Sequence, residues 1–388
     1  MTAVPTTGPT APTGTVGLGL PAVRSGLEGV PTLEAGAPKQ TKKDFTSSSE
    51  VRWCPGCGDY AILAAVQGFL PELGLRRENI VCVSGIGCSS RFPYYLDTYG
   101  LHSIHGRAPA IATGLATSRP DLNVWVVTGD GDALSIGGNH LIHALRRNVN
   151  LTILLFNNRI YGLTKGQYSP TSEPGKVTKS TPAGSVDEPF NPVSLALGAE
   201  ATFVARTLDS DRKHLTSVLR QAVEHRGTAL VEIYQNCPIF NDGAFDVLKD
   251  RDEAQARLVH LEHGRPVRFG APGPDGEPAR GVVRGDDGSL QVVDVAELVA
   301  RDGEAALRRL VVHDAAADDP SQAFALSRLD DRTMTHVPVG VFRSVARPTY
   351  DDLVREQVDA AVGRAGGPAS DGDLAALLAG SDTWAVEA

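Results

Sequence analysis

Short apolar runs alternate with helix-forming stretches through the middle of the chain. The runs rich in Val, Ile and Leu predict strands at 80–84, 122–128, 151–156, 202–206 and 228–234. The stretches around them predict helices at 59–70, 108–118, 138–148, 192–198 and 209–225. Strands that are apolar throughout and alternate with helices indicate a parallel sheet covered on both faces. The predicted fold class is therefore α/β.

The pattern divides the chain into three regions. Residues 1–47 are rich in Thr, Pro, Gly and Ala, and they are predicted to form a disordered tail because they can bury little apolar surface. Residues 48–254 carry the α/β pattern. Residues 255–388 are more charged, with a probable hairpin at 281–295 and a helix capped by Thr349. We expect this last region to be a smaller C-terminal extension.

Charge and hydropathy narrow the classes of function. The 388 residues include 37 basic and 46 acidic side chains, a net charge of −9, which argues against binding to nucleic acid or to an anionic membrane. No apolar run approaches the roughly 20 residues of a membrane helix. The first 20 residues do not have the pattern of a secretory signal. We therefore expect a cytoplasmic protein.

Two polar motifs follow neighbouring predicted strands. Gly-Asp-Gly-Asp occupies 129–132 after one strand, and Asn157 and Asn158 end the next. Carboxyl ends of parallel strands meet at one edge of a sheet, so Asp130 and Asn158 are expected to lie close together. A carboxylate, an amide oxygen and a nearby backbone carbonyl suit a Mg²⁺ ion that also binds phosphate oxygens. This pair of motifs resembles the thiamine-diphosphate fingerprint.

Four of the five cysteines are candidates for metal binding. Cys54 and Cys57 form a C-x-x-C, and Cys88 and Cys237 each follow a predicted strand. A zinc knuckle is one interpretation of the C-x-x-C, but zinc ribbons usually carry a second close pair, which this sequence lacks. Four thiolates near the cofactor edge fit a 4Fe–4S cluster. Cys82 lies within a predicted strand and is expected to be a small buried apolar residue.

Taken together, these motifs resemble one enzyme family. The chain is similar to the β subunits of the 2-oxoacid:ferredoxin oxidoreductases, most closely those acting on 2-oxoglutarate, over residues of about 50 to 240. The likeness rests on the segments 53–58, 85–90, 105–107, 129–132 with 157–158, and 161–167. It implies the thiamine-diphosphate-binding fold, and it implies that the cofactors are thiamine diphosphate, Mg²⁺ and a 4Fe–4S cluster.

The resemblance also implies roles for individual residues. Asp130, Asn158 and the Ile160 carbonyl would bind Mg²⁺. Cys54, Cys57, Cys88 and Cys237 would bind the iron–sulfur cluster. The residues that would contact thiamine diphosphate are Ile86, Gly87, Cys88, Ser89, His105, Gly106, Arg107, Gly129, Asp130, Gly131, Asp132, Ala133, Asn158, Ile160, Gly162, Leu163 and Thr164.

Two residues are candidates for a catalytic role. His105 would line the cofactor. Lys165 lies on the loop after Asn158, where its ammonium could meet a substrate carboxylate. The alternative for Lys165 is an ordinary solvated side chain.

The implied reaction is the oxidative decarboxylation of 2-oxoglutarate with coenzyme A to succinyl-CoA and CO₂, with electrons passing through the cluster to ferredoxin. No carboxylate that would activate the pyrimidine ring is identifiable in the sequence. The resemblance implies that an α subunit supplies it, in a heterodimer or an (αβ)₂ assembly that is inactive without that subunit. Three alternatives remain open: a pyruvate or broad-range 2-oxoacid enzyme, a non-redox thiamine-diphosphate decarboxylase or synthase, and a zinc-stabilised binding module.

Overall fold

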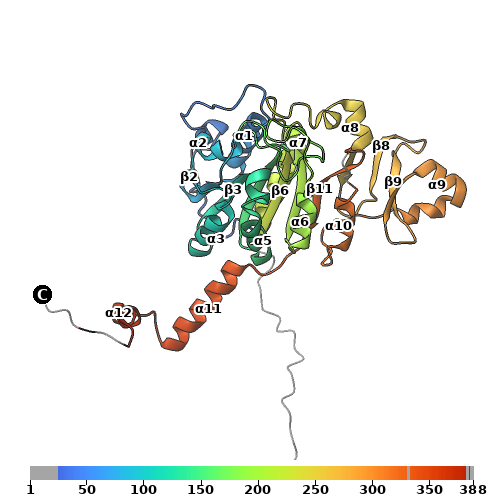
Figure 1. Cartoon of the computed structure of the whole chain (residues 1–388). Coiled ribbons are helices and arrows are strands. Elements are labelled where there is room, and N and C mark those ends of the chain that lie inside the picture. The colour runs from blue at the N-terminus through green and yellow to red at the C-terminus, as the bar shows by residue number, and fades with distance from the viewer. Residues whose placement is uncertain (1–24, 330–332, 382–383, 385–388) are drawn as a thin grey trace, which may run out of the picture.

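The main body of the protein is one eight-stranded sheet. The computed structural model describes residues 25–329, 333–381 and 384, and the sheet order is β2-β1-β3-β4-β6-β5-β11-β7 (Figure 1). The strands are β1 (Ile80–Ser84), β2 (Tyr99–His102), β3 (Asn123–Gly129), β4 (Leu151–Asn157), β5 (Phe203–Leu208), β6 (Thr228–Tyr234), β7 (Leu258–Leu261) and β11 (Val337–Ser344). The six strands from β2 to β5 run parallel, whereas β11 is antiparallel to β5 and parallel to β7.

Helices cover both faces of this sheet. The short helix α2 (Phe92–Tyr95) lies with α1 (Asp59–Phe69) and α7 (Arg212–Glu224) on one face, where their apolar side chains join one hydrophobic cluster with strand residues. The opposite face carries α3 (Ala108–Ser118), α5 (Gly138–Arg147), α6 (Pro192–Gly198) and α10 (Ser321–Ser327), which form a second cluster. The central strands are buried on both faces, as their uninterrupted apolar runs predict. The predicted fold class is confirmed.

Residues downstream of the expected boundary at 254 complete the main sheet. Both β7 and β11 lie beyond that boundary, so part of the region expected to be an extension belongs to the α/β body. Another part of this region forms a three-stranded antiparallel sheet beside it (Figure 1). That sheet and its flanking helices are α8 (Arg251–Arg257), β8 (Arg268–Pro272), β9 (Pro278–Arg284), β10 (Leu290–Asp294) and α9 (Val295–Asp302). The hairpin predicted at 281–295 is the β9–β10 pair.

The segment before the first helix also differs from expectation. Residues 1–24 of the predicted tail lie outside the described residues. Residues 25–47, by contrast, pack on the body: Val30 and Phe45 are buried, and the Gly26 amide donates to the Glu224 carbonyl at 2.9 Å. One buried aromatic ring and a few backbone hydrogen bonds are enough to order a segment whose composition predicts disorder.

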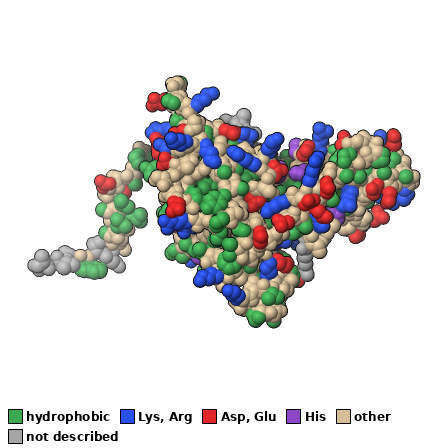
Figure 2. Space-filling view, turned by 90° about the horizontal axis from the view of Figure 1, so that it is seen from above, with side chains coloured by type: hydrophobic (Ala, Val, Ile, Leu, Met, Phe, Trp, Pro, Cys, Tyr) green, Lys and Arg blue, Asp and Glu red, His purple; other side chains and the backbone are tan. Residues whose placement is uncertain are grey.

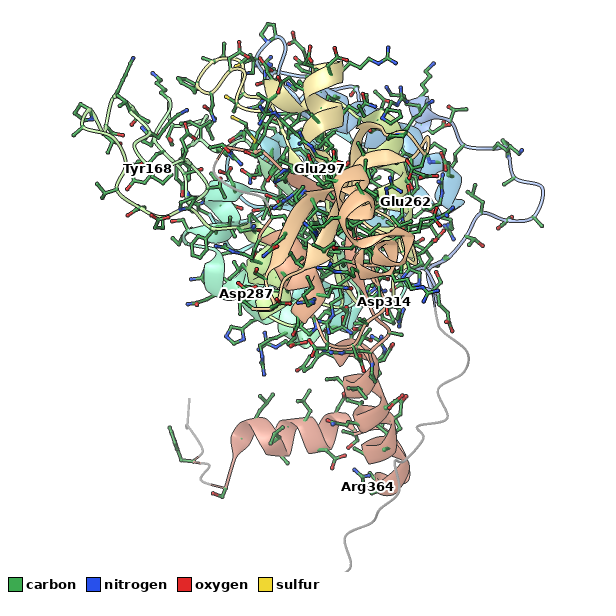
Figure 3. All side chains as sticks on the ribbon, turned by 90° about the vertical axis from the view of Figure 1, so that its right-hand side faces the viewer. Tyr168, Glu262, Asp287, Glu297, Asp314 and Arg364 are labelled. Atoms are coloured by element: carbon green, nitrogen blue, oxygen red, sulfur yellow. The ribbon has the colours of Figure 1, made fainter. Side chains whose placement is uncertain are left out.

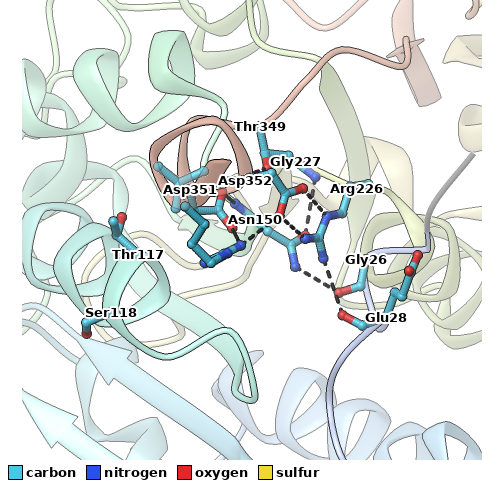
Figure 4. A network of polar contacts seen from close by, with 12 residues as sticks. Gly26, Glu28, Thr117, Ser118, Asn150, Arg226, Gly227, Thr349, Asp351 and Asp352 are labelled. Atoms are coloured by element: carbon cyan, nitrogen blue, oxygen red, sulfur yellow. Dashed lines mark hydrogen bonds and ion pairs between the residues drawn. The ribbon is translucent and has the colours of Figure 1, made fainter. Parts of the chain in front are cut away.

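Two C-terminal helices project from the body at the edge opposite the carboxyl ends of the parallel strands. These are α11 (Tyr350–Ala365) and α12 (Asp371–Ala379), which stand away from the sheet in Figure 1. Figure 3 shows Arg364, near the end of α11, far from the body. Thr349 caps α11 by accepting the Asp352 amide, as predicted. The base of α11 is held by a polar network in which Arg226 binds Asp352 and the Asn150 amide donates to Asp351 (Figure 4).

None of the helices in the described part of the chain combines the length and apolar character needed to cross a membrane.

Candidate cofactor and cluster site

A small cavity of about 70 Å³ lies at the carboxyl ends of β1, β3 and β4. Its lining residues are Ile86, Gly87, Cys88, Ser89, His105, Gly129, Asp130, Gly131, Asp132, Phe156, Asn158, Ile160, Tyr161, Gly162, Leu163 and Thr164. The structure thus brings together fourteen of the seventeen residues that the resemblance assigns to the cofactor. The other three, Gly106, Arg107 and Ala133, do not line the cavity, and Phe156 and Tyr161 were not among the expected contacts.

The Gly-Asp-Gly turn is shaped by the ring of Tyr161. Here β3 ends and the one-turn helix α4 (Asp130–Leu134) begins. A Cβ atom at Gly131 would stand 2.1 Å from the Tyr161 ring, whose hydroxyl donates to the Gly131 carbonyl at 3.0 Å. Only glycine leaves room for this contact, which holds the loop after β4 against the turn after β3.

Asp130 is buried, and two hydroxyl groups approach it. Ser169 and Thr171 both donate to its Oδ2 atom, at 2.5 and 2.7 Å. Burial raises the pKa of Asp130 to about 6, although these two hydrogen bonds act in the opposite direction. A buried carboxylate whose charge is disfavoured in this way is a favourable position for a cation. Neither Ser169 nor Thr171 was predicted, because both lie on the long loop between β4 and α6.

Asn158 and Ile160 supply the neutral oxygens of the proposed metal site. The Asn158 Oδ1 atom accepts the Ile160 amide at 3.2 Å, and its Nδ2 atom donates to Gln235 Oε1 at 2.8 Å. An amide oxygen has two lone pairs, so one remains for a cation. A carboxylate and neutral carbonyl oxygens on the wall of one cavity are the kind of ligands that Mg²⁺ takes, and the site fits this ion.

Asp132 ties together three loops at the edge of the cavity. Its carboxylate accepts the amides of Ile86 and Gly106, at 3.1 and 2.7 Å, and the Thr128 hydroxyl at 2.6 Å. It also pairs with His105 Nδ1. Asp132 therefore positions the loops after β1 and β2 around the cavity, a role beyond the cofactor contact expected for it.

The four candidate cysteines gather beside the same cavity. The thiols of Cys88 and Cys237 lie 3.5 and 3.6 Å from the position that a Cβ atom at Gly162 would take. Cys57 lies near enough to Cys88 and Cys237, and Cys88 to Cys54, for a negative charge on one thiol to raise the pKa of its neighbour. Burial raises the pKa of the Cys57 thiol well above its usual value and that of Cys88 to about 12, so bound metal would have to supply the charge that stabilises the thiolates.

The arrangement of these side chains favours one class of metal centre. In the described residues, no three His, Cys, Asp or Glu side chains converge on a position for a single metal ion. The four thiolates around a 4Fe–4S cluster bind different iron atoms, so they need not converge on one point. Four cysteines spread over three loops fit this kind of centre. Cys82 is buried inside β1, as predicted.

The two catalytic candidates differ in their surroundings. His105 lines the cavity and is held by Asp132. Lys165 is exposed on the loop after β4. It does not line the cavity, although its neighbours Leu163 and Thr164 do. The backbone of Lys165 has a φ of 75°, an uncommon conformation for a non-glycine residue. Arg107 is exposed at the N-terminus of α3.

Comparison with known proteins identifies the family. The family model described as "Thiamine pyrophosphate enzyme, C-terminal TPP binding domain" matches residues 85–233. A 2-oxoacid:ferredoxin oxidoreductase subunit beta from Sulfolobus sp is 48% identical over 192 residues, which are 49% of this chain and 63% of the relative. The 2-oxoglutarate oxidoreductase subunit KorB of Mycobacterium tuberculosis is 65% identical over 359 residues, which are 92% of this chain and 91% of the relative. This chain belongs to the β subunits of the 2-oxoacid:ferredoxin oxidoreductases.

A solved structure agrees with this assignment. The 2-oxoglutarate:ferredoxin oxidoreductase from Magnetococcus marinus, with 2-oxoglutarate, coenzyme A and succinyl-CoA bound, is 33% identical to this β subunit. The match covers 90% of this β subunit and 99% of that chain, with a TM-score of 0.68. The thiamine-diphosphate-binding region at 85–233 includes the whole cavity and Cys88, whereas Cys54, Cys57 and Cys237 lie outside it.

Proposed function

We propose that this β subunit takes part in the oxidative decarboxylation of 2-oxoglutarate with coenzyme A, yielding succinyl-CoA and CO₂, as part of a cytoplasmic complex with an α subunit. Electrons would pass through a 4Fe–4S cluster to ferredoxin. The observation that carries the proposal is the position of Cys88, which lines the cofactor cavity and also belongs to the group of four cysteines. The 2-oxoglutarate enzymes among its relatives support this choice of substrate.

The residues of the cavity would bind and orient the cofactor. Asp130, Asn158 and the Ile160 carbonyl would hold Mg²⁺ against the diphosphate. When bound, thiamine diphosphate supplies the stabilisation of the carbanion that a 2-oxoacid leaves when it loses CO₂. His105, held by Asp132, would present its other ring nitrogen toward the cavity, where it could hold or move a proton.

The four cysteines would provide the route for electrons. Oxidation of a decarboxylated 2-oxoacid releases two electrons, and ferredoxin accepts them one at a time. A cluster bound by Cys54, Cys57, Cys88 and Cys237 would lie directly behind the loop of Gly162, on the wall of the cofactor cavity. A non-redox thiamine-diphosphate enzyme would have no use for thiols at this position.

Apolar side chains at the rim of the cavity support an α subunit as partner. Ile86 and Leu163 line the cavity and yet are 42% and 54% exposed, and Ile104 on the adjacent loop is 74% exposed. Figure 2 views the molecule from above this edge and shows hydrophobic side chains gathered near the middle of the face. A partner that covers the rim would close the cavity and exclude water from it.

The proposal is tested with the αβ complex prepared without oxygen. Ferredoxin reduction that depends on both 2-oxoglutarate and coenzyme A is the expected result, with no activity from the β subunit alone. Release of CO₂ without ferredoxin reduction would instead support a non-redox decarboxylase. Faster turnover of pyruvate than of 2-oxoglutarate would move the assignment to a pyruvate or broad-range enzyme.

A further inference from the structure

The side chain of Gln235 lies between the two cofactor sites. Gln235 follows β6 directly and is 1% exposed. Its Oε1 atom accepts the Asn158 Nδ2 at 2.8 Å, and its Nε2 atom donates to the Cys57 sulfur at 3.2 Å. One buried amide thus contacts a proposed ligand of Mg²⁺ and a proposed ligand of the iron–sulfur cluster.

The sheet register brings these residues together. Asn157 on β4 pairs with Tyr234 on β6, so the next residues, Asn158 and Gln235, leave the sheet side by side. The Gln235 backbone amide donates to the Asn157 carbonyl at 3.0 Å and continues the ladder by one step. Gly58 leaves room for the side chain, because a Cβ atom there would lie 2.9 Å from the Gln235 Cγ.

All the polar groups of the Gln235 side chain are used. Its oxygen accepts from Asn158, and the two hydrogens of its Nε2 atom are directed to the Cys57 sulfur and to the Asn236 carbonyl. A buried amide with every group satisfied has one orientation. The orientation of Asn158 is fixed in turn, because its Nδ2 atom is engaged by Gln235 and its Oδ1 atom is turned toward Ile160.

We infer that Gln235 is a positioning residue that acts on both cofactors. It would hold the Asn158 amide with its oxygen toward Mg²⁺, and it would donate an N–H group to the Cys57 thiolate of the cluster. Hydrogen bonds to cluster sulfurs raise the reduction potential, since reduction adds negative charge that the N–H dipole stabilises. The inference rests on the proposed function, and it adds a residue to which neither the motifs nor the comparisons assign a role.

Two variants separate the two contacts. Gln235→Met keeps the length of the side chain and removes both hydrogen bonds. Gln235→Glu keeps an oxygen acceptor for Asn158 but replaces the donor to Cys57 with a negative charge. The matched control is Gln67→Met, which removes another buried glutamine, one that donates to the Tyr95 carbonyl at 2.9 Å and contacts none of the four cysteines.

Each variant is measured as the αβ complex, by a redox titration of the cluster followed by electron paramagnetic resonance and by calorimetric titration of thiamine diphosphate with Mg²⁺. For Gln235→Met we expect a more negative cluster potential and about a tenfold loss of cofactor affinity. For Gln235→Glu we expect a larger negative shift of the potential, because of the added charge, with affinity within about threefold of the unmodified complex. Gln67→Met should change neither quantity.

The outcomes distinguish this inference from the proposed function. An unmodified complex without iron and without Mg²⁺-dependent cofactor binding overturns both. A normal unmodified complex, with an unchanged potential in Gln235→Glu, overturns the inference alone, and this variant decides the matter if Gln235→Met does not fold. Equal shifts in Gln67→Met would reduce Gln235 to a structural residue and would also overturn it.

Discussion

A chain of buried polar residues leads from the interior of the sheet to the proposed metal site. Arg206 on β5 donates to Glu232 on β6 at 2.7 Å, and both side chains are fully buried. The other Glu232 oxygen accepts from Asn157, which in turn accepts the Thr171 hydroxyl that also reaches Asp130. Removal of one partner of the Arg206–Glu232 pair would leave an uncompensated buried charge, and the chain of hydrogen bonds connects this pair to the Asp130 side of the cavity.

The assignment of the cysteines predicts the iron content of single variants. The unmodified complex, prepared without oxygen, should contain four iron and four sulfide per β subunit. Cys88→Ala removes a proposed ligand on the cavity wall and should lose this content, whereas Cys82→Ala should keep it because Cys82 is buried in β1. Metal analysis and the absorption band near 400 nm provide the measurement. Stoichiometric zinc without iron would contradict the assignment.

Lys165 is predicted to affect the choice of substrate. Its exposed turn adjoins the cavity rim, and the second carboxylate of a bound 2-oxoglutarate would need a cation because an unpaired buried charge is costly. Lys165→Met should lower kcat/KM for 2-oxoglutarate by one to three decades, about 1.4–4 kcal/mol, while activity on pyruvate changes far less. Lys179→Met, at another exposed position of the same loop, is the control.

The outcomes of the Lys165 substitution have distinct meanings. An equal loss on both acids would place the ammonium near the shared carboxylate or the cofactor. An unchanged rate on both would show that Lys165 is an ordinary solvated side chain.

Sequence predicted the cavity residues that belong to motifs at strand ends, but it could not predict their partners. Asp130 and Asn158 are found together because each directly follows a strand of the parallel sheet. Thr171 and Gln235 lie 41 and 77 residues from their side-chain partners Asp130 and Asn158. Which hydroxyl or amide reaches a ligand depends on the path of the long loop after β4 and on the register of β6, and no local pattern encodes either one.

At the scale of elements, α7 has a partly buried imidazole near each end. His214 hydrogen-bonds to Thr207 on β5, and His225 hydrogen-bonds to Thr202, the residue that directly precedes β5. Burial lowers the pKa of each to about 4, so both are neutral near pH 7. The contact between α7 and the sheet therefore depends on these rings remaining uncharged.

Acid should weaken this contact. Between pH 6.5 and 4 the two imidazoles are protonated in the unfolded chain but stay neutral in the folded one. The free energy of unfolding therefore falls as the pH falls through this window, and these groups do not affect it at higher pH. For His225 alone the loss at pH 5 is about 2 kcal/mol. His225→Gln should therefore show a smaller drop in melting temperature between pH 7 and pH 5 than the unmodified chain. An equal drop in both would contradict the role of His225.

The boundaries of the helices and strands show where the local sequence pattern is sufficient to predict an element. The bounds expected for β1, β6, α3 and α6 agree with the structure, because apolar runs and helical stretches there end at clear turns. By contrast β2 is exposed at all four residues, so it has no apolar run to detect. Strand β11 contains Pro338 and Gly340, which both argue locally against a strand. It exists because β5 and β7 provide partners for it.

At the scale of the whole molecule, the C-terminal arm of α11 and α12 is attached mainly at one end. Asp352 binds Arg226 through two hydrogen bonds of 3.0 and 2.6 Å (Figure 4). It also accepts from Arg355 at 2.7 Å. Beyond this base, no side chain of α12 is buried, and Leu377 and Leu378 are each 79% exposed. The position of the arm therefore depends on its first helical turn.

Loss of the anchor should release the arm without unfolding the body. Arg226→Met removes a charged pair worth about 1.5–3 kcal/mol, so local opening at the base of α11 should increase roughly tenfold to a hundredfold. Limited proteolysis with subtilisin, followed by mass spectrometry, should show faster cleavage between the body and α11. Arg364→Met, on the exposed far part of the same helix (Figure 3), should leave the rate unchanged. Equal rates in all three proteins would contradict the anchor.

The antiparallel insertion of β11 also bears on how the chain is made. Strand β5 ends at Leu208, but its antiparallel partner β11 is complete only at Ser344. At a synthesis rate of about 5–20 residues per second, roughly 7–27 s pass between the completion of the two strands. For that time a ribosome-bound chain could present six parallel strands with an open hydrogen-bonding edge, which is a site for pairing with another nascent chain. Arg206 on β5, which is fully buried in the folded protein, makes that edge a poor template. A foreign strand that paired with β5 would have to bury the charge of Arg206 without the residues that cover it in the native structure.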